Sequence, residues 1–216
     1  MGVSVLFDMD GVLVDSEPVI NAAAIMGLAE YGVHAVHEDF LPFVGAGEDK
    51  YIGGVAEKYG VTYQVEMKHR VYQIYLDIVP ERIKVFDGIH DLLESLNKNG
   101  FGVALASSAD LIKIDANLKA AKISREFFQA VVGGEDVINK KPSPDIYLTA
   151  AKRLGEETKD CIVVEDAING IMAAKAAGMR CIAVTTSFPR EVLIEVKPDY
   201  VCDSIPEVKE ILMSLK

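Results

Sequence analysis

Short apolar runs recur along the chain and alternate with segments of helical pattern. The runs cover residues 3–7, 103–106, 130–132, 161–164 and 181–184, with a shorter one at 200–201. Continuous apolar character suits strands that are buried on both faces, as in a parallel sheet covered by helices. This alternation favours an α/β architecture.

The intervening segments carry the spacing, start and stop signals of helices. Residues 88–99 place four apolar side chains on one face, and Gly100 follows as a stop. Ser143 and Pro144 have the N-cap and first-turn chemistry of a helix that runs to Leu154. Repeated strand–helix units with right-handed crossovers predict a doubly wound, Rossmann-like parallel sheet.

One stretch interrupts the alternation of strands and helices. Between Ser16 and about Pro80 no strand pattern is convincing, and the pattern is helical. An all-helical insertion after the first strand predicts a second small domain above the strand ends. We therefore expect a core formed by residues 1–15 and 84–216, and a helical domain formed by residues 16–83.

The chain is acidic, with a formal net charge of −11 over 216 residues. An acidic surface repels a phosphate backbone, so nucleic acid is not an expected partner, although a local cation can still admit a small phosphorylated substrate. We see no secretory signal and no apolar run near the ~18 residues that span a membrane, so no membrane partner is expected. The three cysteines form no C-x-x-C pair, which favours buried reduced thiols and a cytoplasmic location.

Polar residues follow four of the predicted strands. In chain order they are Asp8 and Asp10, Ser107 and Ser108, Lys140 and Lys141, and Glu165 and Asp166. Ligands of open α/β sheets bind at the carboxyl ends of the strands. We therefore expect these side chains to converge on one edge of the sheet.

Three tracts are specific in combination. They read F-D-M-D-G-V-L-V-D-S at 7–16, K-P-S-P-D-I-Y at 141–147 and V-E-D-A-I-N-G-I-M-A-A-K-A-A-G-M at 164–179. With the strand-end residues they resemble the four motifs of the haloacid dehalogenase superfamily over nearly the whole chain. The pattern is similar to that of β-phosphoglucomutase-like phosphatases, and the helical insertion resembles their small cap. The resemblance implies a Mg²⁺ cofactor, a small phosphorylated metabolite as substrate, and a monomer.

Phosphoryl transfer needs an oxygen nucleophile, a proton for the leaving oxygen and neutralisation of the phosphate charge. Asp8, at the strand end, can attack phosphorus and form an aspartyl-phosphate. Asp10 lies two residues on and points the same way if the chain stays extended, so it can protonate the leaving group and later deprotonate water. Lys141 supplies positive charge, and Ser107 can hydrogen-bond a phosphoryl oxygen, with Ser108 secondary to it.

The acidic residues also form the candidate metal site. Mg²⁺ takes oxygen ligands from one or two carboxylates and from phosphate. Asp8, Asp166 and Glu165 are the candidate ligands, and the resemblance adds the backbone carbonyl of Asp10. For Glu165, direct ligation competes with a helix-cap or supporting role. Gly11 lets the backbone turn tightly and offer an amide to the phosphate.

Hydrolysis and phosphosugar mutation share this core, so the cap must distinguish them. A mutase holds a bisphosphate and needs cationic cap residues to bind the second phosphate. The resemblance implies an arginine at 44–50 and a histidine in the first cap helix of a mutase, where this chain has Glu48 and Ile20. We therefore favour hydrolysis of a small phosphate monoester, with a β-phosphoglucomutase-type mutase as the alternative. Glu48 and Lys50 are the candidate substrate contacts of the cap, and Lys50 and Lys113 are the cations that can compensate.

Two further classes remain open. A haloacid dehalogenase uses the same nucleophile without Mg²⁺, and it has no need of Asp10 or of the acidic pair at 165–166. A binding or regulatory module with a decayed site is the non-enzymatic alternative, but every core position here is filled. Metal dependence of turnover separates both alternatives from a phosphatase.

Overall fold

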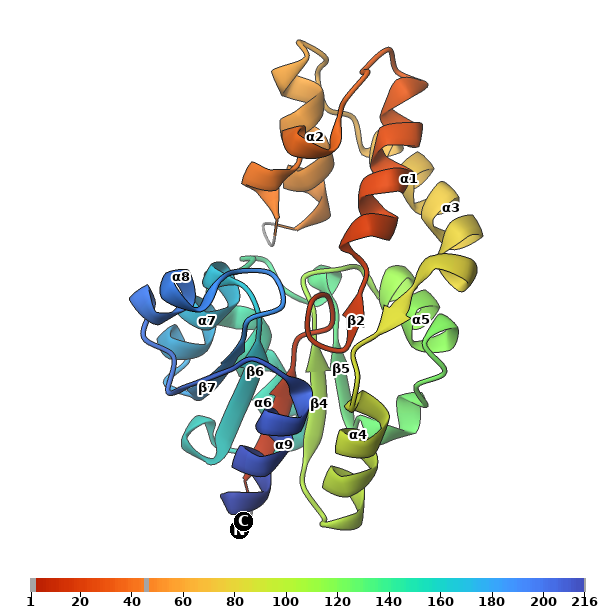
Figure 1. Ribbon diagram of the computed structural model, residues 1–216. Coiled ribbons are helices and arrows are strands. Elements are labelled where there is room, and N and C mark those ends of the chain that lie inside the picture. The colour runs from red at the N-terminus through yellow and green to blue at the C-terminus, as the bar shows by residue number, and fades with distance from the viewer. Residues whose placement is uncertain (1–2, 45–46, 216) are drawn as a thin grey trace.

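Six parallel strands form the central sheet in the spatial order β5-β4-β1-β6-β7-β8 (Figure 1). The computed structural model describes residues 3–44 and 47–215. The strands are β1 (Ser4–Phe7), β4 (Val103–Ala106), β5 (Ala130–Val132), β6 (Cys161–Glu165), β7 (Arg180–Val184) and β8 (Tyr200–Cys202). Each neighbouring pair is parallel, as in β1 and β6, where Phe7 lies opposite Val164. The predicted α/β fold with a parallel sheet is confirmed.

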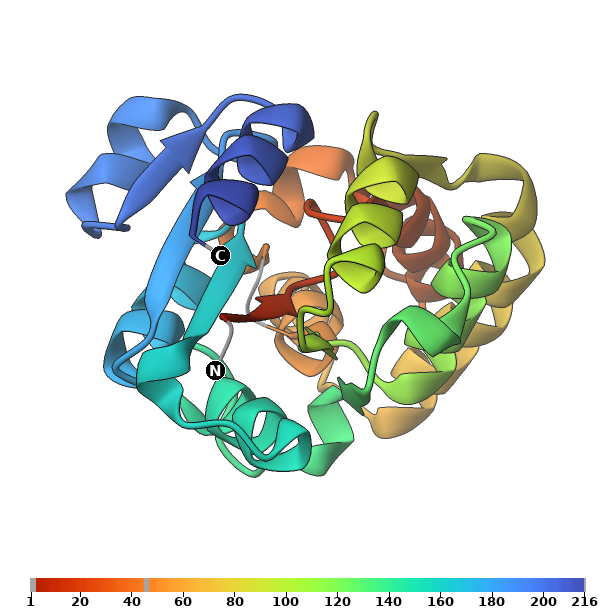
Figure 2. The same cartoon turned by 90° about the horizontal axis from the view of Figure 1, so that it is seen from below.

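Helices cover both faces of the sheet, and the alternation of side chains along each strand explains why both faces are apolar. Val5 and Phe7 belong to one hydrophobic cluster, whereas Leu6 between them belongs to the cluster on the other face. The first face packs against α4 (Ile89–Lys98), α5 (Leu111–Ala120) and α9 (Ile205–Ser214). The second face packs against α6 (Asp145–Leu154), α7 (Ile168–Ala176) and α8 (Arg190–Glu195). Figure 2 shows α4 and α9 on one side of β1 and α6 on the other.

The start of α6 differs from its prediction. The helix begins at Asp145 with Pro144 in the N-cap position, and no side chain caps it. The hydroxyl of Ser143 instead donates to the carboxylate of Asp145 at 2.7 Å. A proline fits this position because its fixed φ angle suits the start of a helix.

A helical unit lies above the carboxyl ends of the strands (Figure 1). It contains α1 (Glu17–Ala29), α2 (Glu48–Lys58) and α3 (Val65–Arg82), which share a hydrophobic cluster separate from those of the sheet. The chain enters and leaves it through an antiparallel pair, β2 (Val14–Asp15) and β3 (Lys84–Val85). The predicted domain boundaries at 16–83 stay a prediction, and they fall beside this pair.

Short 3₁₀ helices complete the secondary structure. They are His37–Asp39, Leu41–Phe43, Arg125–Phe127, Gly134–Asp136 and Thr158–Asp160. The three cysteines are free and buried, as expected. Across residues 3–44 and 47–215, no helix combines the length and apolar character needed to cross a membrane.

Candidate active site

The strand-end residues line one cavity between the sheet edge and the helical unit. The cavity encloses about 190 Å³, which suits a small metabolite. Its core side is lined by Asp8, Asp10, Gly11, Ser107, Ser108, Lys141, Glu165 and Asp166. The cap side adds Ile20, Phe43, Val44, Glu48 and Tyr51. The structure therefore brings together the predicted strand-end residues except Lys140, which is not among the described lining residues and donates to the carbonyl of Gly134 instead.

Lys141 lies at the centre of the buried charges. Its ammonium contacts Oδ1 of Asp8 at 2.5 Å and Oε1 of Glu165 at 2.7 Å. The ring of Tyr147 lies 4.9 Å from the same nitrogen, and its hydroxyl donates to Oε1 of Glu165 at 2.9 Å. The lysine is thus fixed beside the predicted nucleophile by partners from β6 and α6.

Burial raises the pKa of Asp8 to about 7, although Lys141 opposes the shift. For Glu165, burial alone would raise the pKa, but Lys141 and the hydrogen bonds that the carboxylate accepts hold it below its ordinary value. Lys141 lowers the pKa of both carboxyl groups, but Glu165 also accepts from Tyr147 and from the amide of Ala167, so its charged form is the better stabilised.

Both carboxylate oxygens of Glu165 accept hydrogen bonds from other groups of the protein. Oε1 accepts from Lys141 and Tyr147, while Oε2 accepts from the backbone amides of Asp166 and Ala167, each at 2.8 Å. Glycine at position 170 makes room for this carboxylate, since a Cβ there would lie 1.6 Å from Oε1. These contacts argue against the predicted direct ligation of a metal. They favour the alternative in which Glu165 has a supporting role, fixing Lys141 and the backbone that leads into α7, although no side chain caps that helix.

Asp166 faces the cavity with a weaker set of partners. Its Oδ2 accepts from the hydroxyl of Ser187, and burial, followed by the charges of Glu165 and Asp8, raises its pKa well above the ordinary value. Gly11, with φ +80°, packs directly against it, because a Cβ there would lie 1.9 Å from Oδ2. The predicted offer of the Gly11 amide to phosphate is wrong in this structure, because that amide donates to the carbonyl of Val14 at 2.8 Å.

The donor set fits a divalent cation completed by substrate. Lys141 pairs with Asp8 and Glu165, whereas Asp166 has no ion pair among the described residues, and the pKa values of Asp8 and Asp166 are raised. Among the described residues, no three His, Cys, Asp or Glu side chains form a metal-binding group by themselves. Mg²⁺ commonly needs only one or two carboxylates, with phosphate and water as further ligands. Asp8 and Asp166 are the side chains that could supply them.

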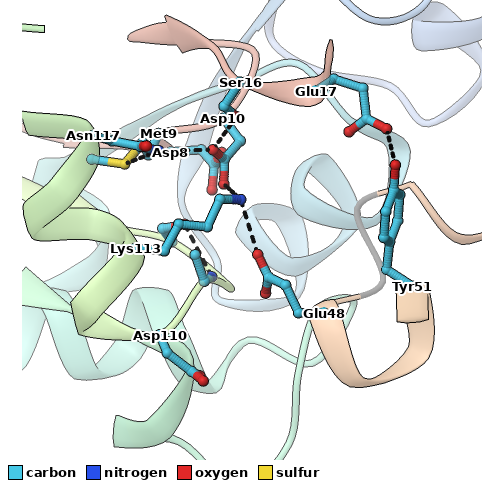
Figure 3. Close-up of polar contacts among 12 residues, drawn as sticks. Asp8, Met9, Asp10, Ser16, Glu17, Glu48, Tyr51, Asp110, Lys113 and Asn117 are labelled. Atoms are coloured by element: carbon cyan, nitrogen blue, oxygen red, sulfur yellow. Dashed lines mark hydrogen bonds and ion pairs between the residues drawn. The ribbon is translucent and has the colours of Figure 1, made fainter. Parts of the chain in front are cut away.

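Asp10 is held by three side chains, one directly before α1 and two on α5 (Figure 3). Its Oδ1 accepts from the hydroxyl of Ser16 and from Nδ2 of Asn117 at 3.3 Å, and its Oδ2 accepts from Lys113 at 3.0 Å. The side chain remains 31% exposed and lines the cavity. Asp10 therefore lines the same cavity as Asp8, and its role at the leaving group stays a prediction.

The predicted cap contacts have different outcomes. Glu48 lines the cavity and bonds to Lys113 at 2.9 Å, so its charge is already paired. Lys50 is exposed and is not among the described residues of the cavity wall. It follows Glu48 by two residues in α2, so the two side chains point in directions about 200° apart around the helix axis. Both residues lie in the first turn of α2, and residues 45 and 46 of the predicted contact segment 44–50 lie outside the described residues.

Sequence reasoning missed several supporting residues. Tyr147 and Ser187 hold the acidic pair, and Asn117 holds Asp10. Tyr147 was within reach of the sequence, because it ends the specific tract at 141–147. Ser187 and Asn117 have no such local signal. Ser107, as predicted, is buried at the cavity, where its Oγ accepts from the amide of Ala109 at 3.1 Å.

Comparisons with known proteins agree with this geometry. SUPPRESSOR OF QUENCHING 1, chloroplastic, of Arabidopsis thaliana is 46% identical over 95% of this chain, and the chain spans only 20% of that protein's length. Hexitol phosphatase B of Escherichia coli (strain K12) is 31% identical, with 89% of each chain covered. The crystal structure of β-phosphoglucomutase from Clostridium difficile shares the fold, with a TM-score of 0.83, 22% identity and coverage of 99% and 98%.

The family model described as haloacid dehalogenase-like hydrolase matches residues 5–184, which include every core residue of the site. The resemblance inferred from the three tracts is thereby confirmed. This chain belongs to the haloacid dehalogenase-like hydrolases.

Proposed function

We propose that the protein is a Mg²⁺-dependent phosphatase that hydrolyses a small phosphate monoester. The observation that carries the proposal is the pairing of Asp8 with Lys141 at the floor of a cavity that Asp10 also lines. Lys141 holds Oδ1 of Asp8, which leaves the second carboxylate oxygen to attack phosphorus. Relatives such as hexitol phosphatase B support this class of reaction.

In the first step, an oxygen of Asp8 forms a bond to phosphorus as the bond between phosphorus and the leaving oxygen breaks. Asp10 donates its proton to the leaving oxygen. In the second step, Asp10 removes a proton from water, whose oxygen attacks phosphorus and releases inorganic phosphate from Asp8. Lys141 keeps positive charge beside the nucleophile throughout. Asp8 and Asp166 would hold Mg²⁺, which when bound would neutralise part of the phosphate charge.

The cap side of the cavity supports a small leaving group without a second phosphate. Its wall combines apolar side chains with Glu48 and Tyr51. Lys113, the cation nearest to Glu48, is already paired with two carboxylates. Among the described lining residues, the cap contributes no lysine or arginine for a second phosphate. This favours hydrolysis over the mutase alternative, and a sugar phosphate or similar metabolite is the proposed substrate.

We expect Mg²⁺ to be needed for hydrolysis of p-nitrophenyl phosphate and to stabilise the protein even without substrate. At ten times its Kd, a ligand of the native state contributes about 1.4 kcal/mol, which raises Tm by about 3–6 °C for a chain of this size. Differential scanning fluorimetry with Mg²⁺ or EDTA measures the shift, and Asp166→Asn should remove most of it. An equal shift in Asp166→Asn, or turnover in EDTA, contradicts the metal assignment.

The same shift should depend on pH. Because the pKa of Asp8 is raised to about 7 from an unfolded value near 4, the native state binds more protons between these values. The metal-free protein therefore loses stability as pH rises through this window, and bound Mg²⁺ must displace the proton. We expect a larger Tm shift at pH 8 than at pH 6.

A separate assay addresses the mutase alternative. Supplied with β-glucose 1-phosphate and a trace of the glucose bisphosphate, the protein should release inorganic phosphate and form no glucose 6-phosphate. The reason is that Lys113 already forms an ion pair with Glu48, and the described cap residues of the cavity wall include no lysine or arginine that could bind a second phosphate. Steady formation of glucose 6-phosphate, measured with a coupled dehydrogenase, would establish the mutase instead.

A further inference from the structure

Helix α5 carries two buried polar side chains that both reach Asp10. Lys113 is 3% exposed and Asn117 is fully buried. They are four residues apart and so lie on the same face of the helix. Each also contacts the cap, through Glu48 on α2 and Tyr75 on α3 respectively. Two core residues thus connect the predicted general acid to two cap helices.

The ammonium of Lys113 bridges the two domains. Figure 3 shows its nitrogen between the carboxylates of Asp10 and Glu48, at 3.0 and 2.9 Å, and the ring of Tyr75 lies 5.6 Å away. Burial alone would lower the pKa of Lys113, but the two carboxylates raise it well above its ordinary value. Burial of an ammonium is unfavourable before its partners compensate. An apolar side chain could pack α5 against the cap without that cost, whereas the ammonium also holds the carboxylate of Asp10.

Asn117 fixes the other oxygen of Asp10. Its Oδ1 accepts from the hydroxyl of Tyr75 at 2.6 Å, which directs its Nδ2 toward Oδ1 of Asp10 and Sδ of Met9, each at 3.3 Å. Lys113 holds Oδ2 of the same carboxylate. Together with the hydroxyl of Ser16, which also donates to Oδ1, these two side chains of α5 set the orientation of the carboxylate.

We propose that Lys113 and Asn117 are positioning residues for Asp10, which align its carboxylate with the leaving oxygen and tie that alignment to the cap through Glu48 and Tyr75. This inference rests on the proposed function, in which Asp10 is the general acid. A small misplacement of such a group can cost about 100-fold in rate. The residues act on the leaving-group side of the reaction, away from the Asp8–Lys141 pair.

Two substrates of different leaving group test the inference. An alkyl phosphate such as glycerol 1-phosphate needs a proton on its leaving oxygen, whereas 2,4-dinitrophenyl phosphate releases a stable anion. The kcat/KM value reports the steps up to formation of the aspartyl-phosphate. We expect Lys113→Met to lower kcat/KM for the alkyl phosphate by about 30- to 100-fold and for the dinitrophenyl ester by no more than about threefold. Lys113→Arg should restore part of the loss, and Asn117→Leu should show the same selectivity.

The controls separate this inference from the proposed function. Lys119→Met changes an exposed lysine on the same helix and should leave both substrates unaffected. If Asp10→Asn itself fails to distinguish the two substrates, the general-acid assignment is wrong. If Asp10→Asn distinguishes them but Lys113→Met lowers both equally, the positioning role is overturned. Should Lys113→Met not fold by circular dichroism, the double variant with Glu48→Gln removes the unpaired buried charge and is judged by the same ratio.

Discussion

Asp8→Asn should abolish turnover of p-nitrophenyl phosphate, with a loss of at least about 10⁴-fold in kcat, because an amide cannot form the aspartyl-phosphate. The substitution keeps the size of a side chain that is only 7% exposed, and its oxygen can still accept from Lys141. The loss should therefore come from chemistry and not from unfolding. Steady-state release of p-nitrophenolate measures it.

The stability of the same variant gives an independent check. Because burial raises the pKa of Asp8 to about 7, the wild-type protein holds a buried charge at pH 8 that the amide lacks. Without metal at pH 8, Asp8→Asn should melt at the same temperature as the wild type or higher. Asp87→Asn, at an exposed position, serves as the matched control and should keep full activity. Turnover above one hundredth of wild type in a folded Asp8→Asn protein would refute the nucleophile assignment.

The strand pattern and the residues that follow each strand were predictable because both are local properties of the chain. A continuous apolar run marks a strand buried on both faces, and its last residue marks the sheet edge. Asp8 and Ser107 were placed correctly on that basis alone. The parallel order of the sheet then brings such residues together without any knowledge of side-chain contacts.

The partners of these residues were not predictable, because they come from distant parts of the sequence. Lys113 lies 103 residues from Asp10 and 65 from Glu48, so no local pattern links the three. Glu165 was a reasonable candidate metal ligand from its sequence position, but Tyr147 and two backbone amides donate hydrogen bonds to its carboxylate. Gly11 was expected to offer its amide to the phosphate, but in the turn that it makes this amide donates to the carbonyl of Val14. Residue type and spacing predict which groups meet, whereas side-chain direction decides what each one does.

Lys141→Met should lower kcat/KM by about 10²- to 10³-fold, because the variant removes the positive charge that contacts Asp8 and that, in the proposed mechanism, would neutralise charge on the transferred phosphoryl group. The charge of Lys141 lowers the pKa of Asp8, so its removal raises that pKa further. A larger fraction of Asp8 is then protonated at neutral pH, and the acid limb of the pH–rate profile should move to higher pH. Measurement of kcat/KM between pH 5 and 9 tests both effects.

The neighbouring lysine provides the matched control for this prediction. Lys140 donates to the carbonyl of Gly134 and is not among the described cavity-lining residues, so the kcat/KM of Lys140→Met should stay within about threefold of wild type.

Substrates with different leaving groups should distinguish the roles of the two buried lysines of the site, Lys141 and Lys113. Lys141 acts on the nucleophile, so Lys141→Met should slow the dinitrophenyl and alkyl phosphates alike. Lys113 contacts only Asp10 among the predicted catalytic groups, so its loss should be felt mainly by the alkyl phosphate. Equal selectivity in the two variants would mean that the charges do not divide the reaction in this way.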